Sequence, residues 1–149
     1  MDDAHARGLE RLYLAAPVNR LYAPEIRVSD DAVEISIPVS PDHFHGGGGL
    51  HGAVLFKLLD DAAFFAANAR VRDQLVITAS FHVHFLRPVK AGRLAARGRL
   101  VSRARKLIVA EAVVRDERDR EVARGSGTFL PSGLPLTELP GYLGSRETN

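Results

Sequence analysis

The apolar segment from Val54 to Asn68 constrains the fold of this chain more than any other feature. Its leucines and alanines recur at spacings of three and four residues, which places them on one face of a buried α-helix. Four later segments have the residue pattern of strands, and they cover residues 74–85, 92–102, 107–115 and 121–130. One long helix followed by four strands predicts an α+β fold, with the helix packed on one face of an antiparallel meander.

Two stripes of side chains run along this predicted helix. The apolar stripe comprises Leu55, Leu58, Leu59, Ala62 and Ala66. The polar stripe comprises Lys57, Asp60, Asp61 and Asn68. Aspartate is a poor helix former, so two adjacent aspartates in the middle of a helix indicate a functional or structural role.

The rest of the chain gives weaker signals. Asp3 to Ala15 predicts a short helix, and a loop is expected between Pro17 and Pro24. Residues 32–38 alternate between apolar and polar and predict a strand that ends at Pro38. Residues 116–119 (Asp-Glu-Arg-Asp) predict the turn of a hairpin.

We therefore expect one domain over residues 1–149, because this length suits a single hydrophobic core. Its core is expected over about residues 30–131, preceded by the helix at 3–15. Pro131, Gly133 and Pro135 predict the end of regular structure, followed by a loosely ordered tail over 132–149. A helix on one sheet face leaves the other face and the edges to be covered, which favours self-association.

Composition excludes several classes of protein. The chain has no cysteine, so disulfides, thiolate catalysis and Cys-ligated zinc are ruled out, and a cytoplasmic location is expected. No apolar run approaches the roughly 18 residues of a membrane span, and the acidic start Met-Asp-Asp is unlike a signal peptide. The net charge is only +2, and no aromatic residues are interleaved with the arginines, so nucleic-acid binding is not expected.

The His51-Gly52 pair and Asp60 suggest a site for acyl chemistry. Gly52 begins the apolar helix, where free backbone N–H groups and the positive end of the helix dipole suit an oxyanion. Asp60 follows within the helix, where a carboxylate is costly unless it has a role. Together they suggest that the backbone N–H of Gly52 polarises a carbonyl group and that Asp60 activates water.

Two His-x-His pairs, His43 with His45 and His82 with His84, raise the possibility of a metal site. Neither pair contains an acidic ligand, so we expect no metal. The four glycines from Gly46 to Gly49 resemble the oxyanion loop of lipase-like hydrolases, but the chain lacks their Gly-x-Ser-x-Gly elbow. We interpret these glycines, Gly49 included, as allowing the backbone to approach a thioester or its pantetheine arm.

The segment from His51 to Asn68, with Phe85-Leu86-Arg87-Pro88 downstream and Gly125-Ser126-Gly127-Thr128-Phe129 near the end, resembles the hotdog-fold thioesterases. The similarity covers about residues 30–131 and is greatest to the phenylacetate-degradation (PaaI-like) branch. The resemblance implies a hotdog fold, in which an antiparallel sheet wraps a long central helix. It also implies an acyl-CoA substrate, no cofactor, and a homodimer or homotetramer.

Roles follow from the resemblance residue by residue. The Gly52 amide is the expected oxyanion donor, and His51 either holds the loop or takes part in catalysis. Asp60 matches the catalytic carboxylate, as general base or nucleophile, with Asp61 as the alternative. Thr78 matches the residue that orients the attacking water.

Two positions depart from the family, and one basic group remains to be placed. Ala53, expected to contact the substrate, stands where a second glycine is usual. His45 stands where related enzymes carry asparagine, so His45 is a candidate donor to the thioester. Three basic residues near a strand-to-strand turn are expected to contact the phosphates of coenzyme A; these are Arg103, Arg105 and Lys106.

The spacing of Gly52 and Asp60 predicts an active site shared between subunits. Eight residues of helix separate them by about 12 Å, whereas a donor and a base acting on one carbonyl must both approach within about 3 Å or through one water. Gly52 of one subunit is therefore expected to act with Asp60 of another, across a two-fold interface.

Two other functions remain open. The same fold supports hydration or dehydration of an acyl thioester, with His45 or His51 as the base and Asp60 assisting. A non-catalytic acyl-CoA-binding module is the other, and it gains support from the missing asparagine at position 45.

Overall fold

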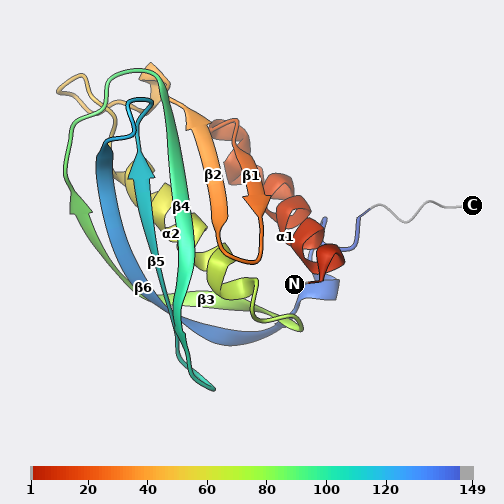
Figure 1. The fold of residues 1–149 in the computed structure, drawn as a ribbon. Helices are drawn as coiled ribbons and strands as arrows, with labels where there is room; N and C mark the ends of the chain where they lie inside the picture. Colours follow the sequence, from red (N-terminus) through yellow and green to blue (C-terminus); the bar gives the residue numbers. More distant parts are fainter. Residues whose placement is uncertain (1, 145–149) are drawn as a thin grey trace, which may run out of the picture.

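The computed structural model describes residues 2–144, which form one six-stranded antiparallel sheet and two α-helices (Figure 1). The helices are α1 (Asp3–Ala15) and α2 (Gly52–Asn68). The strands are β1 (Glu25–Val28), β2 (Val33–Pro38), β3 (Gln74–Phe85), β4 (Arg93–Arg103), β5 (Ile108–Arg115) and β6 (Glu121–Pro135). Short 3-10 helices occur at η1 (Pro17–Leu21), η2 (Pro41–His43) and η3 (Leu136–Glu138). The predicted α+β class, a sheet around a long helix, is confirmed.

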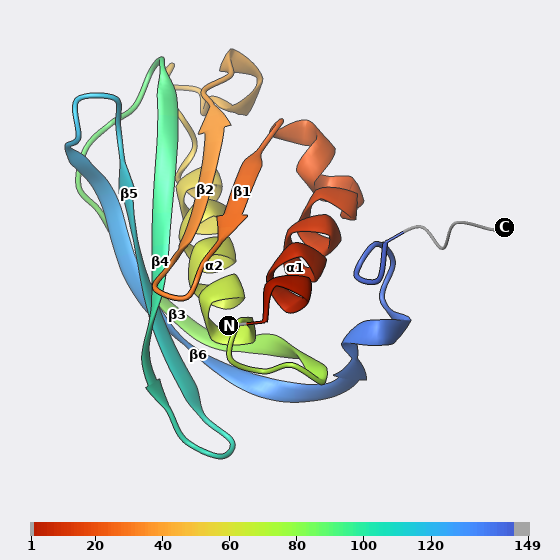
Figure 2. The ribbon, with the colours of Figure 1, turned by 45° about the vertical axis from the view of Figure 1, so that its right-hand side comes forward.

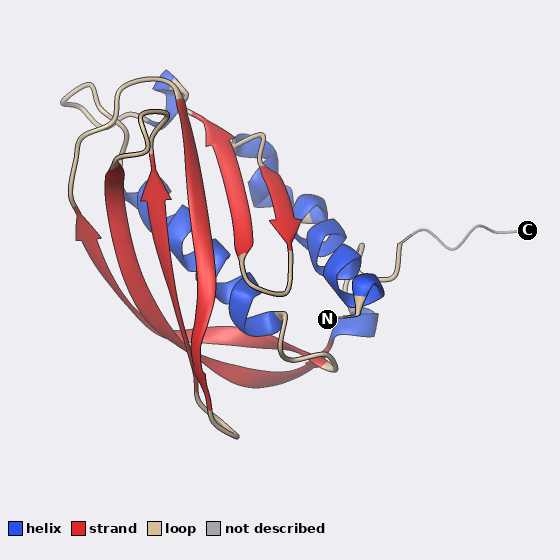
Figure 3. Ribbon diagram, in the orientation of Figure 1, coloured by secondary structure: helices blue, strands red, loops and turns tan. Residues whose placement is uncertain are grey.

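The sheet curves around α2, and α1 lies on the side of α2 away from β4 and β5 (Figures 2 and 3). The predicted apolar stripe of α2 is buried in full, from Leu55 to Ala66. Gly98 of β4 allows the strand to lie very close to α2, because any Cβ atom at this position would be only 2.1 Å from the Ala62 carbonyl oxygen. The helix backbone therefore rests directly on the sheet at this point.

The strand order is β1-β2-β4-β5-β6-β3, which corrects the predicted meander. β4, β5 and β6 are consecutive neighbours, but β3 pairs with β6 and not with β4. Residues 86–92 connect β3 to β4. This connection is longer than a tight hairpin and crosses over β6 and β5, so that β4 lies on the far side of these two strands. β3 is therefore an edge strand, with pairing on one side only within the described chain.

Two local expectations were wrong. The segment expected as a loop after Pro17 contains η1, and β1 follows it as a strand too short to show alternation. Asn68 is buried, not on a polar face: its side chain donates to the Val71 and Gln74 carbonyls and accepts from the Val76 N–H. The helix begins at Gly52, the glycine expected at its start, two residues before the apolar run.

The expected loose tail differs from the structure over residues 132–144. β6 continues to Pro135, Leu136 is buried, and Tyr142 packs against Gly8 of α1. The His5 ring lies between the Tyr142 hydroxyl, at 2.7 Å, and the Asn68 carbonyl oxygen, at 3.0 Å. These contacts tie the C-terminal segment to α1 and α2, whereas residues 145–149 of the expected tail lie outside the described part.

Candidate functional site

Asp60 and Thr78, two of the candidate site residues, lie in contact with each other. Asp60 lies on the side of α2 that faces β3, and the Thr78 hydroxyl donates a hydrogen bond to its Oδ1 at 2.8 Å. Burial raises the pKa of Asp60 above its ordinary value, and the neighbouring Asp61 charge adds to this effect. The Thr78 hydroxyl and, more weakly, Lys57 act in the opposite direction. Such a carboxylate is a stronger base than one in water.

Asp61, the alternative catalytic carboxylate, is engaged in contacts with neighbouring side chains. Its Oδ2 atom forms an ion pair with Lys57 and accepts a hydrogen bond from the Tyr13 hydroxyl at 3.1 Å. The Lys57 ammonium also donates to the Asn19 side chain at 2.6 Å. Asp61 therefore links α2 to α1 and η1, and the geometry favours Asp60 as the carboxylate for chemistry.

An apolar pocket of about 330 Å³ opens beside Asp60. Asp60 and Thr78 line it together with the polar side chains around Asp61. The apolar lining comes from Leu12, Ala16, Val18, Phe64, Phe65, Leu75 and Leu139. Pockets that are mostly apolar with a few convergent polar groups are typical of ligand sites.

His51 caps the start of α2. Its Nδ1 accepts the Ala53 N–H at 2.9 Å, so the amide of Ala53 is already used. The N–H of Gly52, as the first residue of the helix, has no acceptor within the helix. The Phe85 ring covers Gly52, with its atoms 3.2 Å from where a Cβ would lie. The structure thus joins the His-Gly pair to the Phe-Leu-Arg-Pro segment.

His45 organises the glycine loop. Its Nδ1 accepts the Gly47 N–H at 3.0 Å, and its backbone N–H donates to the Gly49 carbonyl at 2.9 Å. The rings of His45 and His51 are 6.4 Å apart between centroids. Gly49 is buried here, and a Cβ atom on it would lie 3.3 Å from His45 Nε2 and 3.5 Å from the Val89 carbonyl oxygen.

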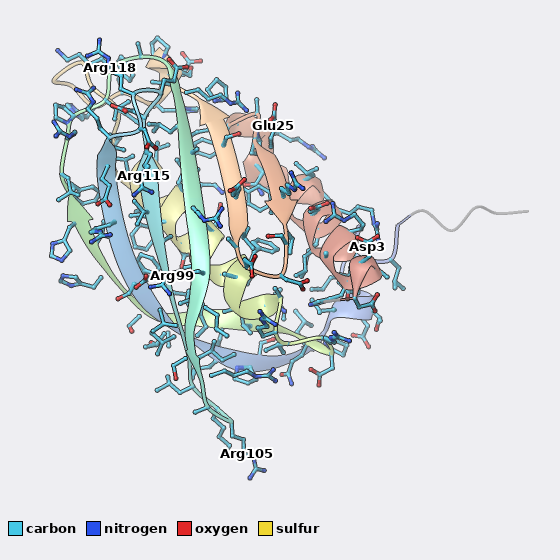
Figure 4. The ribbon with its side chains drawn as sticks, viewed as in Figure 1. Asp3, Glu25, Arg99, Arg105, Arg115 and Arg118 are labelled. Atoms are coloured by element: carbon cyan, nitrogen blue, oxygen red, sulfur yellow. The ribbon has the colours of Figure 1, made fainter. Side chains whose placement is uncertain are left out.

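The predicted site residues therefore form two groups on one chain. One group contains Asp60 and Thr78; the other contains His45, Gly49, His51, Gly52 and Ala53 around the start of α2. The basic residues lie with neither group. Arg103 donates to the Arg70 carbonyl beyond the end of α2, and Arg105 is at the tip of the projecting β4–β5 hairpin (Figure 4).

No metal site is formed within residues 2–144, where no three His, Asp or Glu side chains gather closely enough to hold an ion. The His82 and His84 rings are 4.7 Å apart on the outer surface of the sheet. A larger hollow of about 520 Å³ lies elsewhere on the outer face of the sheet, among charged side chains such as Arg97 and Arg115. Several of these charges are already paired, and the hollow lies away from Asp60. None of the helices in this part of the chain is both long and apolar enough to cross a membrane.

Sequence reasoning missed the polar cluster formed by Tyr13, Asn19, Lys57 and Asp61. The four-residue spacing of Lys57 and Asp61 indicates an ion pair on one helix face. The approach of Tyr13 and Asn19 depends on how α1 packs, so no local pattern reveals it. Lys57 also lies 5.4 Å from the Tyr13 ring centroid, which adds a cation–π contact.

A sheet wrapped around one helix, with a half-buried carboxylate on that helix and a His-Gly pair at its start, defines a hotdog-fold protein with a hydrolase-like site. The family model described as the thioesterase superfamily matches residues 47–123, just over half of the chain. The chain belongs to the thioesterase superfamily.

Known proteins agree with this assignment. A curated protein of Saccharolobus solfataricus, named provisionally as an esterase, is 30% identical over 84 residues, which is 56% of this chain and 56% of that protein. The chain thus matches little more than half the length of that relative. A thioesterase family protein from Silicibacter pomeroyi is 27% identical, with a TM-score of 0.78 over 85% of this chain and 96% of that one.

The PaaI protein of E. coli, from the phenylacetic acid degradation operon, has the same fold. Its TM-score is 0.77 at 20% identity, over 89% of this chain and 99% of that one. This likeness therefore extends beyond the residues that match the family model.

Proposed function

We propose that this protein is an acyl-CoA thioesterase, which hydrolyses an acyl thioester to the free acid and coenzyme A. The observation that carries the proposal is the Asp60 carboxylate, held by Thr78 at an apolar pocket where burial raises its pKa. Membership of the thioesterase superfamily supports a hydrolase. A base next to a pocket that shelters an acyl group is what thioester hydrolysis needs.

In one form of the reaction, Asp60 removes a proton from water while the water oxygen attacks the thioester carbonyl carbon. The carbonyl oxygen gains negative charge, and the Gly52 N–H stabilises it. The carbon–sulfur bond then breaks, and the proton passes from Asp60 to the departing thiolate. In the other form, the Asp60 carboxylate attacks the carbonyl carbon directly, the carbon–sulfur bond breaks and coenzyme A leaves as the thiolate. Water then hydrolyses the mixed anhydride, which releases the free acid, restores the Asp60 carboxylate and supplies the proton that the thiolate takes up. Thr78 positions Asp60 in both.

The two halves of the site are supplied by two copies of the chain in this proposal. β3 is an edge strand of 12 residues whose outer side has no partner strand within residues 2–144, and large apolar side chains near it are exposed. These are Phe56, Ile77, Phe85 and Leu86. Pairing of two β3 strands covers the edge and brings Gly52 of a second copy towards Asp60. His45 and His51 then hold the donor loop, and the hairpin residues Arg103, Arg105 and Lys106 are left to contact the phosphates of coenzyme A.

The test is release of free thiol from a panel of acyl-CoA thioesters by the wild type and by Asp60→Asn. The chain has no cysteine, so a thiol reagent sees no protein background. We expect turnover by the wild type and a loss of about 10²-fold or more in the near-isosteric variant. Equal rates in both proteins contradict the role of Asp60. Binding of acyl-CoA without turnover by the wild type indicates a binding module or a hydratase instead.

A further inference from the structure

The pocket beside Asp60 is lined partly by residues inside the segment that matches the family model and partly by residues outside it. One wall is α2 with the start of β3, where Phe64, Leu75, Asp60 and Thr78 lie within the segment that matches the family model. The opposite wall comes from outside that segment. It consists of Leu12 at the end of α1, Ala16 and Val18 just after it, and Leu139 after η3.

The outer wall is fixed in place by the polar cluster of Tyr13, Asn19, Lys57 and Asp61. Tyr13 and Asn19 belong to α1 and η1, while Lys57 and Asp61 belong to α2. The Asn19 side chain also donates to the Tyr13 carbonyl at 2.7 Å, and the Tyr13 ring packs edge-to-face on Phe65 at 5.3 Å. Buried polar groups that are satisfied in this way specify one arrangement of the elements they join.

We propose that this pocket is the acyl subsite, that it takes an apolar acyl group, and that Leu12 and its neighbours limit the length of that group. The proposal rests on the proposed function, because a thioester carbonyl held at Asp60 has its acyl substituent beside the same pocket. The lining around Leu12, Phe64 and Leu139 offers apolar contact, and the polar side chains are engaged with each other. Asp60 lies within the segment that matches the superfamily model. The pocket residues outside that segment, from α1 and the C-terminal segment, set the length of the acyl group.

The experiment compares kcat/KM for straight-chain acyl-CoA thioesters of increasing length, from acetyl upwards. Leu12→Trp narrows the pocket and Leu12→Ala enlarges it. The control is Leu14→Trp, on the same helix but 51% exposed and not part of the lining. Ala16→Phe provides a second narrowing variant if Leu12→Trp does not fold, as judged by circular dichroism.

The measured quantity is the ratio of kcat/KM for the longest acyl group that the wild type hydrolyses to kcat/KM for acetyl. We expect this ratio to fall about tenfold or more in Leu12→Trp and to change less than about twofold in Leu14→Trp. In Leu12→Ala, the longest accepted acyl group becomes longer. Equal ratios in the wild type and in both narrowing variants overturn the proposal.

The proposed function can fail separately. If the wild type releases no thiol, calorimetry with non-hydrolysable S-alkyl-CoA thioethers of increasing length tests the pocket on its own. A gain in affinity with chain length that Leu12→Trp removes and Leu14→Trp keeps supports the subsite without catalysis. A chain-length dependence that is the same in both variants overturns it.

Discussion

Asp60 carries its charge in surroundings that oppose ionisation, and Thr78 partly offsets this. The Thr78 hydroxyl donates to the ionised carboxylate, so it favours the charged form and lowers the pKa. The carboxyl group must be ionised to act as a base, so we expect activity to be lost when the pH falls through its pKa.

Thr78→Val is expected to move the acid limb of the pH–kcat/KM profile to higher pH. The variant loses the hydrogen bond to the charged form, so the pKa of Asp60 rises further. We also expect kcat/KM at neutral pH to fall about tenfold, the effect of one hydrogen bond to a charged group. Thr78→Ser retains the hydroxyl and should keep the wild-type profile; a limb that stays in place in Thr78→Val contradicts the role of Thr78.

Gly52→Pro tests the oxyanion donor, because proline removes the N–H and is tolerated at the first position of a helix. The preceding His51 has φ −64° and ψ 137°, an extended conformation that a following proline requires. We expect kcat to fall about 10²- to 10³-fold while α2 remains intact by circular dichroism. Gly52→Ala makes a similar contact with Phe85 but keeps the N–H, so it separates crowding from the loss of the donor.

At the scale of elements, α2 and β4 depend on the absence of a side chain at Gly98. A Cβ atom there overlaps the carbonyl of Ala62, and the obstacle is backbone that cannot rotate away. Gly98→Ala is expected to reduce the free energy of unfolding by more than about 3 kcal/mol in urea denaturation. Gly46→Ala, with open space around it, should change it by less than about 0.5 kcal/mol.

Elements with a clear hydrophobic periodicity could be predicted from the sequence. Elements stabilised by contacts between residues far apart in the chain could not. α2 and β3 were predicted almost to the residue because their patterns are long. β1 has only four residues, and the pairing of β3 with β6 is decided by a crossover with no local signature. The ordered stretch around Leu136 follows Pro135, and its stability comes from packing on the rest of the fold.

The same distinction applies to the candidate site. His51, Gly52 and Asp60 could be chosen as candidates from their positions at the start of the helix and within it, and Thr78 from the family resemblance. The contact between Asp60 and Thr78 follows from β3 passing alongside α2. The pocket wall around Leu12 could not be predicted, because it depends on how α1 packs against the finished sheet.

At the scale of the whole molecule, a shared site makes two inactive variants complement each other. In a dimer of Asp60→Asn with Gly52→Pro, one site combines both changes and the other combines an intact Asp60 with an intact Gly52. After denaturation and refolding as a mixture, activity should recover to about one quarter of the wild type, because half of the dimers are mixed and each has one intact site.

Refolding each variant alone provides the control and should restore no activity. If both groups act within one chain, the mixture stays inactive as well, and the proposal of a shared site is wrong. Analytical ultracentrifugation of the same samples gives the assembly state, and an active wild type of monomeric mass leads to the same conclusion.

The pocket wall is made by residues from both ends of the described chain, with Leu12 near one end and Leu139 near the other. During synthesis, Leu12 leaves the ribosome long before Leu139 exists. The helix that carries Asp60 can therefore meet its sheet before the pocket is closed. A chain that ends before Leu139 would keep Asp60 but lack part of the wall that we propose limits the acyl group.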